Sequence, residues 1–461
     1  MALVGAFIVP HPPLIVPEVG RGEEKKVSKT IQSYNEVARR IAELKPDTII
    51  ITTPHSIMYS DYFHISPGKK AKGNFGGFRA KDVAFQVDYD EEFVQTLEAF
   101  AEREGIEAGT LGEKNPELDH GTMVPLYFIN QYYKDYQLVR IGLSGLSLPL
   151  HYRLGKCVDK TATKLNRRIV FVASGDLSHK LKEEGPYGFA QEGVDFDRQI
   201  VEAMTEGDFL KFLEFNPDLC ESAAECGLRS FIIMAGALSG KAIESKFLSY
   251  EGTFGVGYGV CEYKIVGEAS NRNFDEIFTQ KQRELAKELQ KQEDPYVHLA
   301  RHSLETYIST GKYAKLTEGL PEEMLNRKAG VFVSLKKHGS LRGCIGTISP
   351  VTANIAKEIL RNAVSAAAED PRFAPVAEDE LDELIYSVDV LSPAEPIDSM
   401  EELDVNRYGV IVTSGRKRGL LLPNLEGVDT VEQQVEIAKK KAGIYNNETV
   451  SLERFEVVRH K

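Results

Sequence analysis

The chain has 461 residues, of which 27% are charged and 42% apolar, and its formal net charge is −13. This length predicts two domains, and the acidic balance without a basic patch excludes a general nucleic-acid binder. No apolar stretch approaches the ~20 residues that span a bilayer. Five scattered cysteines argue against a disulfide framework. We therefore expect a cytoplasmic protein in a reducing environment, with no nucleic-acid and no membrane partner.

Two short apolar runs near the N-terminus both end in Pro-His. The first, AFIVPH, places His11 after residues 6–9, and the second, TIIITTPH, places His55 after residues 48–53. Both runs are rich in β-branched residues and are predicted to be buried strands. Residues 25–44 between them carry apolar side chains at helical spacing. The three segments predict a βαβ unit, whose parallel strands bring both imidazoles to one edge of an open sheet.

The alternation of helices and strands continues to about residue 265. In chain order we predict a helix over 91–104, a strand over 136–146, a helix over 150–165, a strand over 168–179, a buried helix over 227–238 and a closing strand pair over 246–266. This order predicts an N-terminal α/β domain over residues 1–265, an α/β/α sandwich-like unit with a mixed or largely parallel sheet.

The composition changes after Gly267. Residues 266–293 are polar and lack a wide apolar stripe, so they predict a solvated helical linker. Residues 294–461 begin with a helical pattern over 295–310 and continue with strands that do not alternate regularly with helices. The predicted strands include 330–337, 384–392 and 409–415. We therefore expect a second domain of the α+β class.

His11 and His55, delivered to one sheet edge, have the composition of half a metal site. Two histidines and one carboxylate hold a catalytic Fe(II) and leave open positions on one face for a substrate and dioxygen. Glu225, just before the buried helix, is the carboxylate that we predict as the third ligand. Two simpler interpretations stay open. The histidines can be solvent-facing loop residues, and Glu225 can be a carboxylate that only caps a helix N-terminus.

Three further polar residues are predicted to reach the same edge. LDHG places His120 before a helix-like segment, and GDLSH places Asp176 and His179 at the end of a predicted strand. A neutral imidazole near a metal can take a phenolic proton and return it, which contributes typically ~10²–10⁴-fold to a rate. We predict all three as catalytic residues, with Asp176 orienting an imidazole or supporting a ligand histidine.

Five short motifs in the first 265 residues resemble those of one family. PHPPLI, TPHS, LDHG, GDLSH and AEC before an apolar helix resemble the class III extradiol ring-cleavage dioxygenases of the catalytic B-subunit type, whose fold the Memo-like proteins share. The resemblance implies Fe(II) held by His11, His55 and Glu225, with His179 as the acid/base and His120 positioning the substrate or handling protons. The implied reaction is ring cleavage of an aromatic diol by dioxygen.

Cys226 directly follows Glu225, and Memo-like relatives can carry a cysteine where the dioxygenases carry the glutamate. A one-residue shift of the alignment therefore exchanges the third ligand, and a thiolate favours copper or zinc over iron. We prefer Glu225 on ligand chemistry and retain Cys226 as the alternative metal ligand. The corresponding alternative function is a Memo-like protein that binds a metal or a partner and does not cleave rings.

Four phrases in the second half resemble the AMMECR-type domain, in the order found in that family: SLRGCIGTISP, DPRFAPV, VDVLSPAEPI and RKRGLLLPNL. Together, the two domains resemble protein A of the AmmeMemoRadiSam system, which implies a radical SAM protein as a partner. A homo-oligomer is also compatible with this organisation. The resemblance names the second domain without implying an activity for it.

Arg342, Gly343 and Cys344 within SLRGCIG are the residues of the second domain that we single out. The glycine permits close approach to the backbone, and the guanidinium supplies a fork for an anion. We predict that these residues form a groove for a small anion or a peptide. The alternative is that the segment is a tightly packed core strand.

Overall fold

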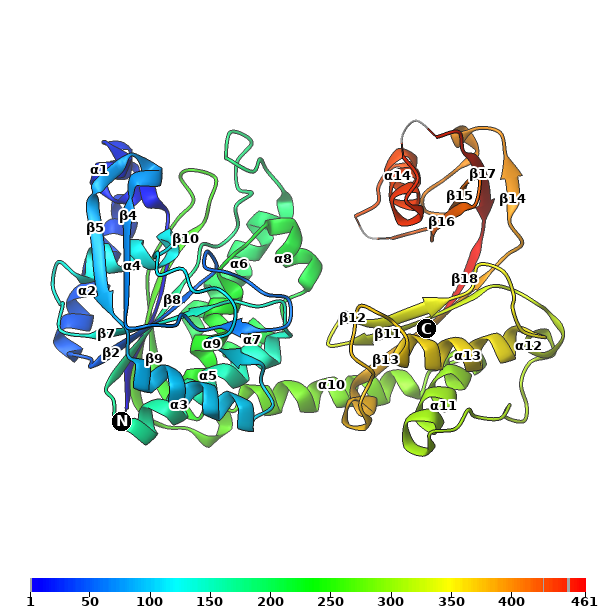
Figure 1. Cartoon of the computed structure of the whole chain (residues 1–461), viewed down its shortest axis with the longest axis horizontal. Coiled ribbons are helices and arrows are strands. Elements are labelled where there is room, and N and C mark those ends of the chain that lie inside the picture. Colours follow the sequence, from blue (N-terminus) through cyan, green and yellow to red (C-terminus); the bar gives the residue numbers. More distant parts are fainter. Residues whose placement is uncertain (1, 426, 446–447) are drawn as a thin grey trace. The chain divides into compact units, whose positions relative to one another are not determined.

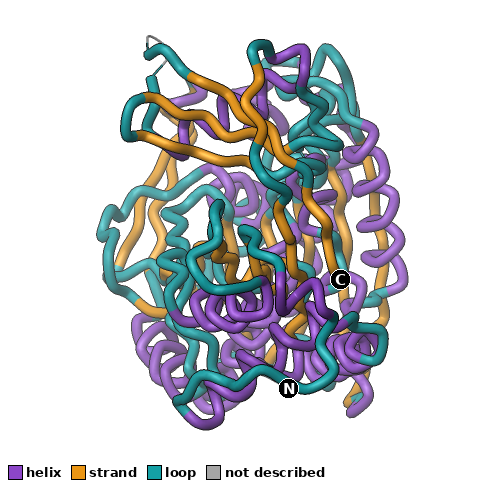
Figure 2. The backbone as a smooth tube through the Cα atoms, turned by 90° about the vertical axis from the view of Figure 1, so that its right-hand side faces the viewer, coloured by secondary structure: helices purple, strands orange, loops and turns teal. Residues whose placement is uncertain are grey.

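The computed structural model describes residues 2–425, 427–445 and 448–461. The chain divides into two compact units, Met1–Phe278 and Thr279–Lys461. Both units combine helices with strands, and Figure 2 colours the backbone by helix, strand and loop. The predicted class, an α/β unit followed by an α+β unit, is confirmed.

The first unit is built on a six-stranded sheet with the order β7-β2-β8-β1-β10-β9 (Figure 1). Its first four strands in this order are parallel to one another, whereas β10 and β9 are antiparallel to their neighbours, so the sheet is mixed. The strands are β1 (Leu3–Val9), β2 (Thr48–Thr53), β7 (Gln137–Gly142), β8 (Ile169–Ser174), β9 (Lys241–Glu251) and β10 (Tyr258–Glu268). Strand β8 separates the two strands that precede His11 and His55, yet both histidines emerge at the same sheet edge.

Both faces of this sheet are buried, which explains the continuous apolar runs in the sequence. Phe7 and Ile8 are adjacent in β1, and each is fully buried in a different core. One core contains α3 (Glu91–Arg103), α5 (Leu148–Leu165), α6 (Gln191–Glu206), α7 (Phe209–Leu213) and α9 (Leu228–Ala237); the other contains α2 (Ser28–Leu44) and α4 (His120–Ile129). The unit is therefore a three-layer α/β/α sandwich.

The first unit also contains shorter elements outside the six-stranded sheet. A short pair joins β3 and β6, and a hairpin is formed by β4 and β5. The remaining elements are η1 (Pro13–Ile15), α1 (Pro17–Gly20), η2 (Glu23–Val27), β3 (Phe63–His64), β4 (Lys70–Phe75), η3 (Gly76–Phe78), β5 (Ala80–Asp88), β6 (Ala108–Gly109), α8 (Pro217–Ala223) and η4 (Ser270–Arg272).

Helix α10 (Phe274–Gln290) occupies most of the segment that we predicted as a solvated linker. Its first turns are not solvated, since Phe278 is 3% exposed within a core of the first unit and Asp275 pairs with Lys156 at 2.9 Å. Farther along the helix, Arg283 pairs with the buried Glu383 at 3.2 Å. Helix α10 therefore packs through a few apolar residues together with charged pairs, although its sequence has no wide apolar stripe.

The second unit contains two four-stranded sheets, ordered β12-β11-β13-β18 and β14-β17-β15-β16. Helices α11 and α13 share a core with the first sheet, and α14 shares a core with the second. The elements are α11 (Pro295–Thr310), α12 (Glu322–Asn326), β11 (Val331–Lys337), β12 (Ser340–Gly346), α13 (Ile355–Ala368), η5 (Glu378–Glu383), β13 (Leu384–Leu391), β14 (Glu395–Ile397), η6 (Met400–Glu402), β15 (Gly409–Ser414), β16 (Lys417–Leu421), α14 (Val431–Ala442), β17 (Ser451–Phe455) and β18 (Val457–His460).

The structure also describes the helices and the cysteines that the composition singled out. Across the described residues, no helix has both the length and the apolar character needed to cross a membrane. All five cysteines are free thiols.

Candidate metal centre

The ends of β1, β2 and β8 deliver the polar residues of the site to one edge of the sheet. His11 lies two residues beyond β1, is 1% exposed, and its backbone N–H donates to Asp176 Oδ1 at 2.8 Å. The Tyr34 hydroxyl, from α2, donates to the carbonyl of Pro10 and fixes the chain just before His11. The backbone N–H of His55 donates to Thr53 Oγ1 at 3.2 Å. Both histidine loops are therefore held by the strands and helices beside them.

Three imidazoles pack against one another at this edge. The rings of His11 and His55 meet edge to face with centroids 4.6 Å apart, and their Nε2 atoms are 2.8 Å apart. The ring of His120, the first residue of α4, lies 4.0 Å from that of His55 and 5.5 Å from that of His11. The structure thus brings His11, His55 and His120 together at this edge of the sheet.

Ser174, the last residue of β8, sets the tautomer of His11. Its hydroxyl donates to the carbonyl of Gly121 at 2.6 Å, so its single proton is already used. Ser174 Oγ must then accept from His11 Nδ1–H, at 3.0 Å. His11 Nε2 consequently carries the lone pair, which is the arrangement that a metal-binding imidazole requires.

The residue that completes the cluster is Cys226 and not the preferred Glu225. Cys226 Sγ lies 3.7 Å from His11 Nε2 and accepts from the backbone N–H of Asp176 at 3.3 Å. Glu225 Oε2 instead accepts from the backbone N–H of Leu228 at 2.7 Å and caps the start of α9. The two adjacent side chains take different directions, and the capping role left open from the sequence is the one that Glu225 has.

Close backbone contact brings Cys226 to the site. A Cβ on Gly175 would lie 2.2 Å from the Cα of Gly227, so the segment after β8 and the segment before α9 touch without side chains between them. Residues 175–179, which we predicted as the end of a strand, are a loop. The N–H of Gly175 still donates to Val9 of β1, but the next four N–H groups donate to residues in or beside α6, α8, α9 and β10. This loop carries Asp176 and His179.

Burial and mutual repulsion keep the histidines neutral. The pKa of His11 lies well below its usual value, first because of burial and then because of the neighbouring His55, His120 and His179. Burial likewise lowers the pKa of His55 to about 4, and it lowers the pKa values of His120 and His179. Neutral imidazoles supply the lone pairs that metals and phenolic protons need.

His179 and Asp176 lie beside the cluster of His11, His55 and Cys226. The carbonyl of Ala224 accepts from His179 Nδ1–H, which leaves Nε2 as the basic nitrogen, 4.0 Å from Asp176 Oδ2. Burial raises the pKa of Asp176 to about 7, although the N–H of His11 opposes this shift. Asp176 Oδ2 is also 3.8 Å from His11 Nε2. The carboxyl group therefore lies between the two imidazoles.

Sequence reasoning missed Asp119 and Ser174, which orient the site without belonging to the metal cluster. Asp119 caps α4 through the N–H of Thr122 at 3.1 Å and accepts from Thr53 Oγ1 at 2.6 Å, so it ties the His120 segment to the end of β2. Arg140 pairs with it at 3.4 Å. The Asp-His-Gly order in LDHG, an N-cap before a helix start, was the available signal for Asp119.

The donor set fits a metal ion. His11, His55 and Cys226 each offer one donor atom, and the three atoms lie within 4.8 Å of one another. Donors that share one ion lie about 2.8–4.5 Å apart, given bond lengths of about 2.0–2.3 Å. Burial, followed by Asp176 and Glu225, raises the pKa of the Cys226 thiol well above its usual value. A bound cation would offset this cost and hold the sulfur as a thiolate.

Asp197, behind the site loop, gives the first unit a measurable pH dependence. It is 3% exposed and accepts from the backbone N–H of Ser178 and from the Tyr250 hydroxyl, each at 2.7 Å. Burial raises its pKa to about 7, so the folded chain holds a proton that the unfolded chain releases near pH 4. The resulting stability is complete below about pH 4 and is lost as pH rises to 7.

We therefore expect Asp197→Asn to gain stability relative to the wild type as pH rises from 5 to 8. The gain is at most about 1.4 kcal/mol per pH unit for one group. Thermal unfolding midpoints of both proteins at several pH values measure it. A constant difference between the two midpoints across this range would contradict a raised pKa at this position.

Arg342, Gly343 and Cys344 lie on β12 of the second unit. The Arg342 guanidinium makes a two-pronged pair with Glu380, at 2.8 and 2.9 Å, and also donates to the carbonyl of Ala374. A Cβ on Gly343 would lie 2.1 Å from the carbonyl oxygen of Ala366 in α13. The close packing of β12 against α13 explains why residue 343 is a glycine. The Arg342 guanidinium donates to acceptors within the second unit.

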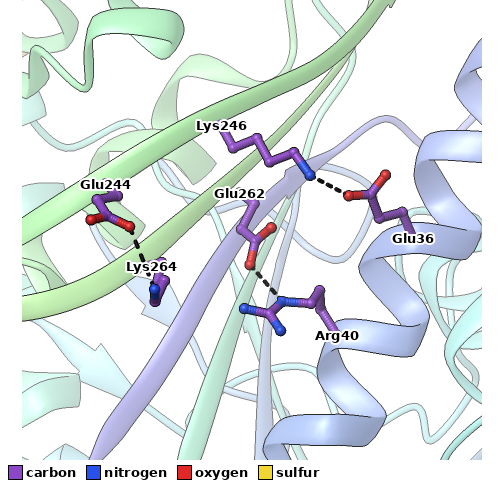
Figure 3. Close-up of a pocket in the computed structure, with 6 residues that line it drawn as sticks. All are labelled: Glu36, Arg40, Glu244, Lys246, Glu262 and Lys264. Carbon is purple, nitrogen blue, oxygen red and sulfur yellow. Dashed lines mark hydrogen bonds and ion pairs between the residues drawn. The ribbon is translucent and has the colours of Figure 1, made fainter.

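A surface depression formed by α2, β9 and β10 of the first unit is lined by charged residues: Glu36, Arg40, Glu244, Lys246, Glu262 and Lys264 (Figure 3). Three ion pairs join them, Lys246 to Glu36 at 2.5 Å, Arg40 to Glu262 at 3.0 Å and Lys264 to Glu244 at 3.5 Å. Each charge thus has an opposite partner, and we assign no ligand to this depression.

A three-layer sandwich with histidines at the carboxyl ends of its strands defines a protein with the fold of the extradiol ring-opening dioxygenases. Residues 5–261 match the family described as the catalytic LigB subunit of aromatic ring-opening dioxygenase, and the chain belongs to this family. Residues 297–460 match the AMMECR1 family, so the second unit is an AMMECR1 domain.

Similar proteins match either the whole chain or part of it. Protein CA_C1420 of Clostridium acetobutylicum is 47% identical over 469 aligned residues, covering all of both chains. A Thermotoga maritima protein is 53% identical over 171 residues, 37% of this chain and 98% of its own length. The crystal structure of the uncharacterized protein PH0010 from Pyrococcus horikoshii matches 36% of this chain and 88% of its own, with 33% identity and a TM-score of 0.34.

Proposed function

We propose that the first unit is a metal-dependent oxygenase that acts on a small aromatic diol, with its ion held by His11, His55 and Cys226. The observation that carries the proposal is the convergence of neutral imidazoles and one thiol at one edge of the sheet. The LigB family match supports the choice of an aromatic ring-opening type of reaction.

The residues around the ion have distinct roles in this proposal. When bound, an ion held by these residues would supply the chemistry that brings a diol and dioxygen together. His179 Nε2 takes a phenolic proton, because its other nitrogen is fixed as a donor to Ala224. Asp176 stabilises the resulting imidazolium. His120, whose ring lies 4.0 Å from that of His55, positions the substrate ring beside the cluster.

The thiol at position 226 favours a second candidate function. Thiolate ligands select softer ions, such as copper and zinc, more than a carboxylate does. In that case the unit binds a metal, or a partner through the metal, and does not turn over catechols. The two candidates share the same ligands and differ in the ion and in the reaction with oxygen.

One measurement separates them. The full chain is purified without oxygen, its metals are quantified, and oxygen uptake is followed with a panel of catechols. We expect iron near one ion per chain and uptake with at least one catechol. Tight copper or zinc binding without uptake would replace the oxygenase proposal with the second candidate.

The different roles proposed for His179 and for the ligands His11 and His55 can be tested by substitution. We expect His179→Ala to keep the metal and to lower the rate of oxygen uptake by ~10²–10⁴-fold, because it removes only a proton acceptor. His11→Ala and His55→Ala should lose the metal. His298→Ala, on exposed α11 surface of the second unit, is the matched control. Equal metal loss from His179→Ala would make His179 a ligand.

A further inference from the structure

Exposed apolar side chains gather on loops that carry or touch the site histidines. Phe78 is 39% exposed, and its ring lies 5.6 Å from that of His120. Tyr187 is 61% exposed, and its ring lies 5.1 Å from that of His179. Met58, three residues after His55, is 49% exposed. Large apolar groups clustered at a polar site mark a binding surface more often than scattered ones do.

Phe78 is held in place by its surroundings. It ends η3, at the tip of the hairpin of β4 and β5, and its ring meets that of the fully buried Phe75 at 6.1 Å. The next residue, Arg79, has a φ of +64°, and its carbonyl accepts from the Arg21 guanidinium at 3.1 Å. The ring is therefore presented to the site by a fixed turn, at little further entropic cost on binding.

Tyr187 comes from a different segment, the loop between β8 and α6. Leu181 and Phe189 form a bridge that closes this loop, and Lys182 Nζ donates to the carbonyl of Thr253 at 2.9 Å. The ring packs edge to face on His179, which is the proposed proton acceptor. Two aromatic rings from separate loops thus touch the two histidines outside the metal cluster.

We propose that Phe78 and Tyr187 are the specificity-determining residues of the site and select planar aromatic ligands over aliphatic ligands of equal polarity. The proposal rests on the proposed function only for placing the ligand at the metal centre. Ring contacts of this kind contribute about 0.5–1.5 kcal/mol beyond area burial, which corresponds to about two- to tenfold in affinity.

The chain contains no tryptophan, so a single introduced tryptophan reports on its own surroundings. We would prepare Phe78→Trp and Tyr187→Trp in the full chain and titrate each, without oxygen, with catechol and with cis-1,2-cyclohexanediol. The second compound also carries two vicinal hydroxyls, but it lacks the planar ring and the phenolic acidity of catechol. Tyr132→Trp, at a position that is 41% exposed and bonded to Asn35, is the control.

We expect catechol to quench both site tryptophans saturably, with an apparent affinity at least threefold higher than that of the cyclohexanediol. Adding Tyr187→Ala to Phe78→Trp should weaken catechol binding by about two- to tenfold. The control should show only linear, collisional quenching. Linear quenching at both site positions, or equal affinity for the two compounds, overturns the proposal.

The outcome is separable from that of the proposed function. Saturable quenching by catechol in a protein that takes up no oxygen would remove the oxygenase and leave the ring-binding residues in place. Oxygen uptake with catechol, combined with quenching that does not saturate, would retain the oxygenase and remove Phe78 and Tyr187 as its specificity-determining residues.

Discussion

Cys226→Ala is expected to lower metal affinity by more than 100-fold, whereas Glu225→Gln should leave it within about threefold of the wild type. Removing the sulfur takes away one of three converging donor atoms. A glutamine at 225 can still accept from the N–H of Leu228 and so preserve the start of α9. Equilibrium dialysis with iron, copper and zinc measures both variants.

The design distinguishes a ligand from a residue that only shapes the site. Cys220→Ala removes a neighbouring, partly buried thiol on α8 and serves as the control for general effects of losing a cysteine. If Glu225→Gln lost the metal and Cys226→Ala kept it, the carboxylate preferred on ligand chemistry would be the third ligand, and the proposed His-His-Cys centre would be abandoned.

Gly236→Ala is expected to destabilise the first unit by roughly 3 kcal/mol or more, because it overpacks a contact between two backbones. A Cβ at Gly236 in α9 would lie 1.9 Å from the carbonyl oxygen of Tyr152 in α5. A Cβ at Gly155 would lie 1.9 Å from the carbonyl oxygen of Ile233. The two helices touch at both glycines, and neither carbonyl can move without disturbing its own helix.

Calorimetric unfolding of the full chain tests this expectation. Gly267→Ala is the matched control, because the atom nearest to a Cβ there is that of Ala242 at 3.9 Å and the backbone is not left-handed. A melting temperature of Gly236→Ala equal to that of the control would show that α5 and α9 can separate at small cost.

The order of helices and strands was predictable because burial leaves a strong signal in this sequence. Strands β1 and β2 are covered on both faces, so they appear as continuous β-branched runs. The position of β8 between them was not predictable, since strand order depends on packing among segments more than 100 residues apart. The end of β8 at Ser174 was also missed, although Gly175 and Asp176 are residue types that strands disfavour.

The site was predictable in its histidines and ambiguous in its third ligand. His11, His55, His120 and His179 follow strands or open helices, so their positions were fixed by the elements themselves. Glu225 and Cys226 are adjacent, and the direction of each side chain depends on the turn before α9, which the sequence leaves undefined. The radical SAM partner and the groove around Arg342 stay predictions.

The placement of β1 between β8 and β10 has a consequence for synthesis of the protein. His11 and Cys226 meet at 3.7 Å although they are 215 residues apart in the chain. On a ribosome, the first histidine emerges long before the thiol with which it shares the cluster, and β1 has neither neighbour until β8 and then β10 have been made. Domains fold as units during translation, so the three donors assemble only when nearly all of the first unit has left the exit tunnel. In the proposed function, acquisition of an ion would therefore report that this unit is complete.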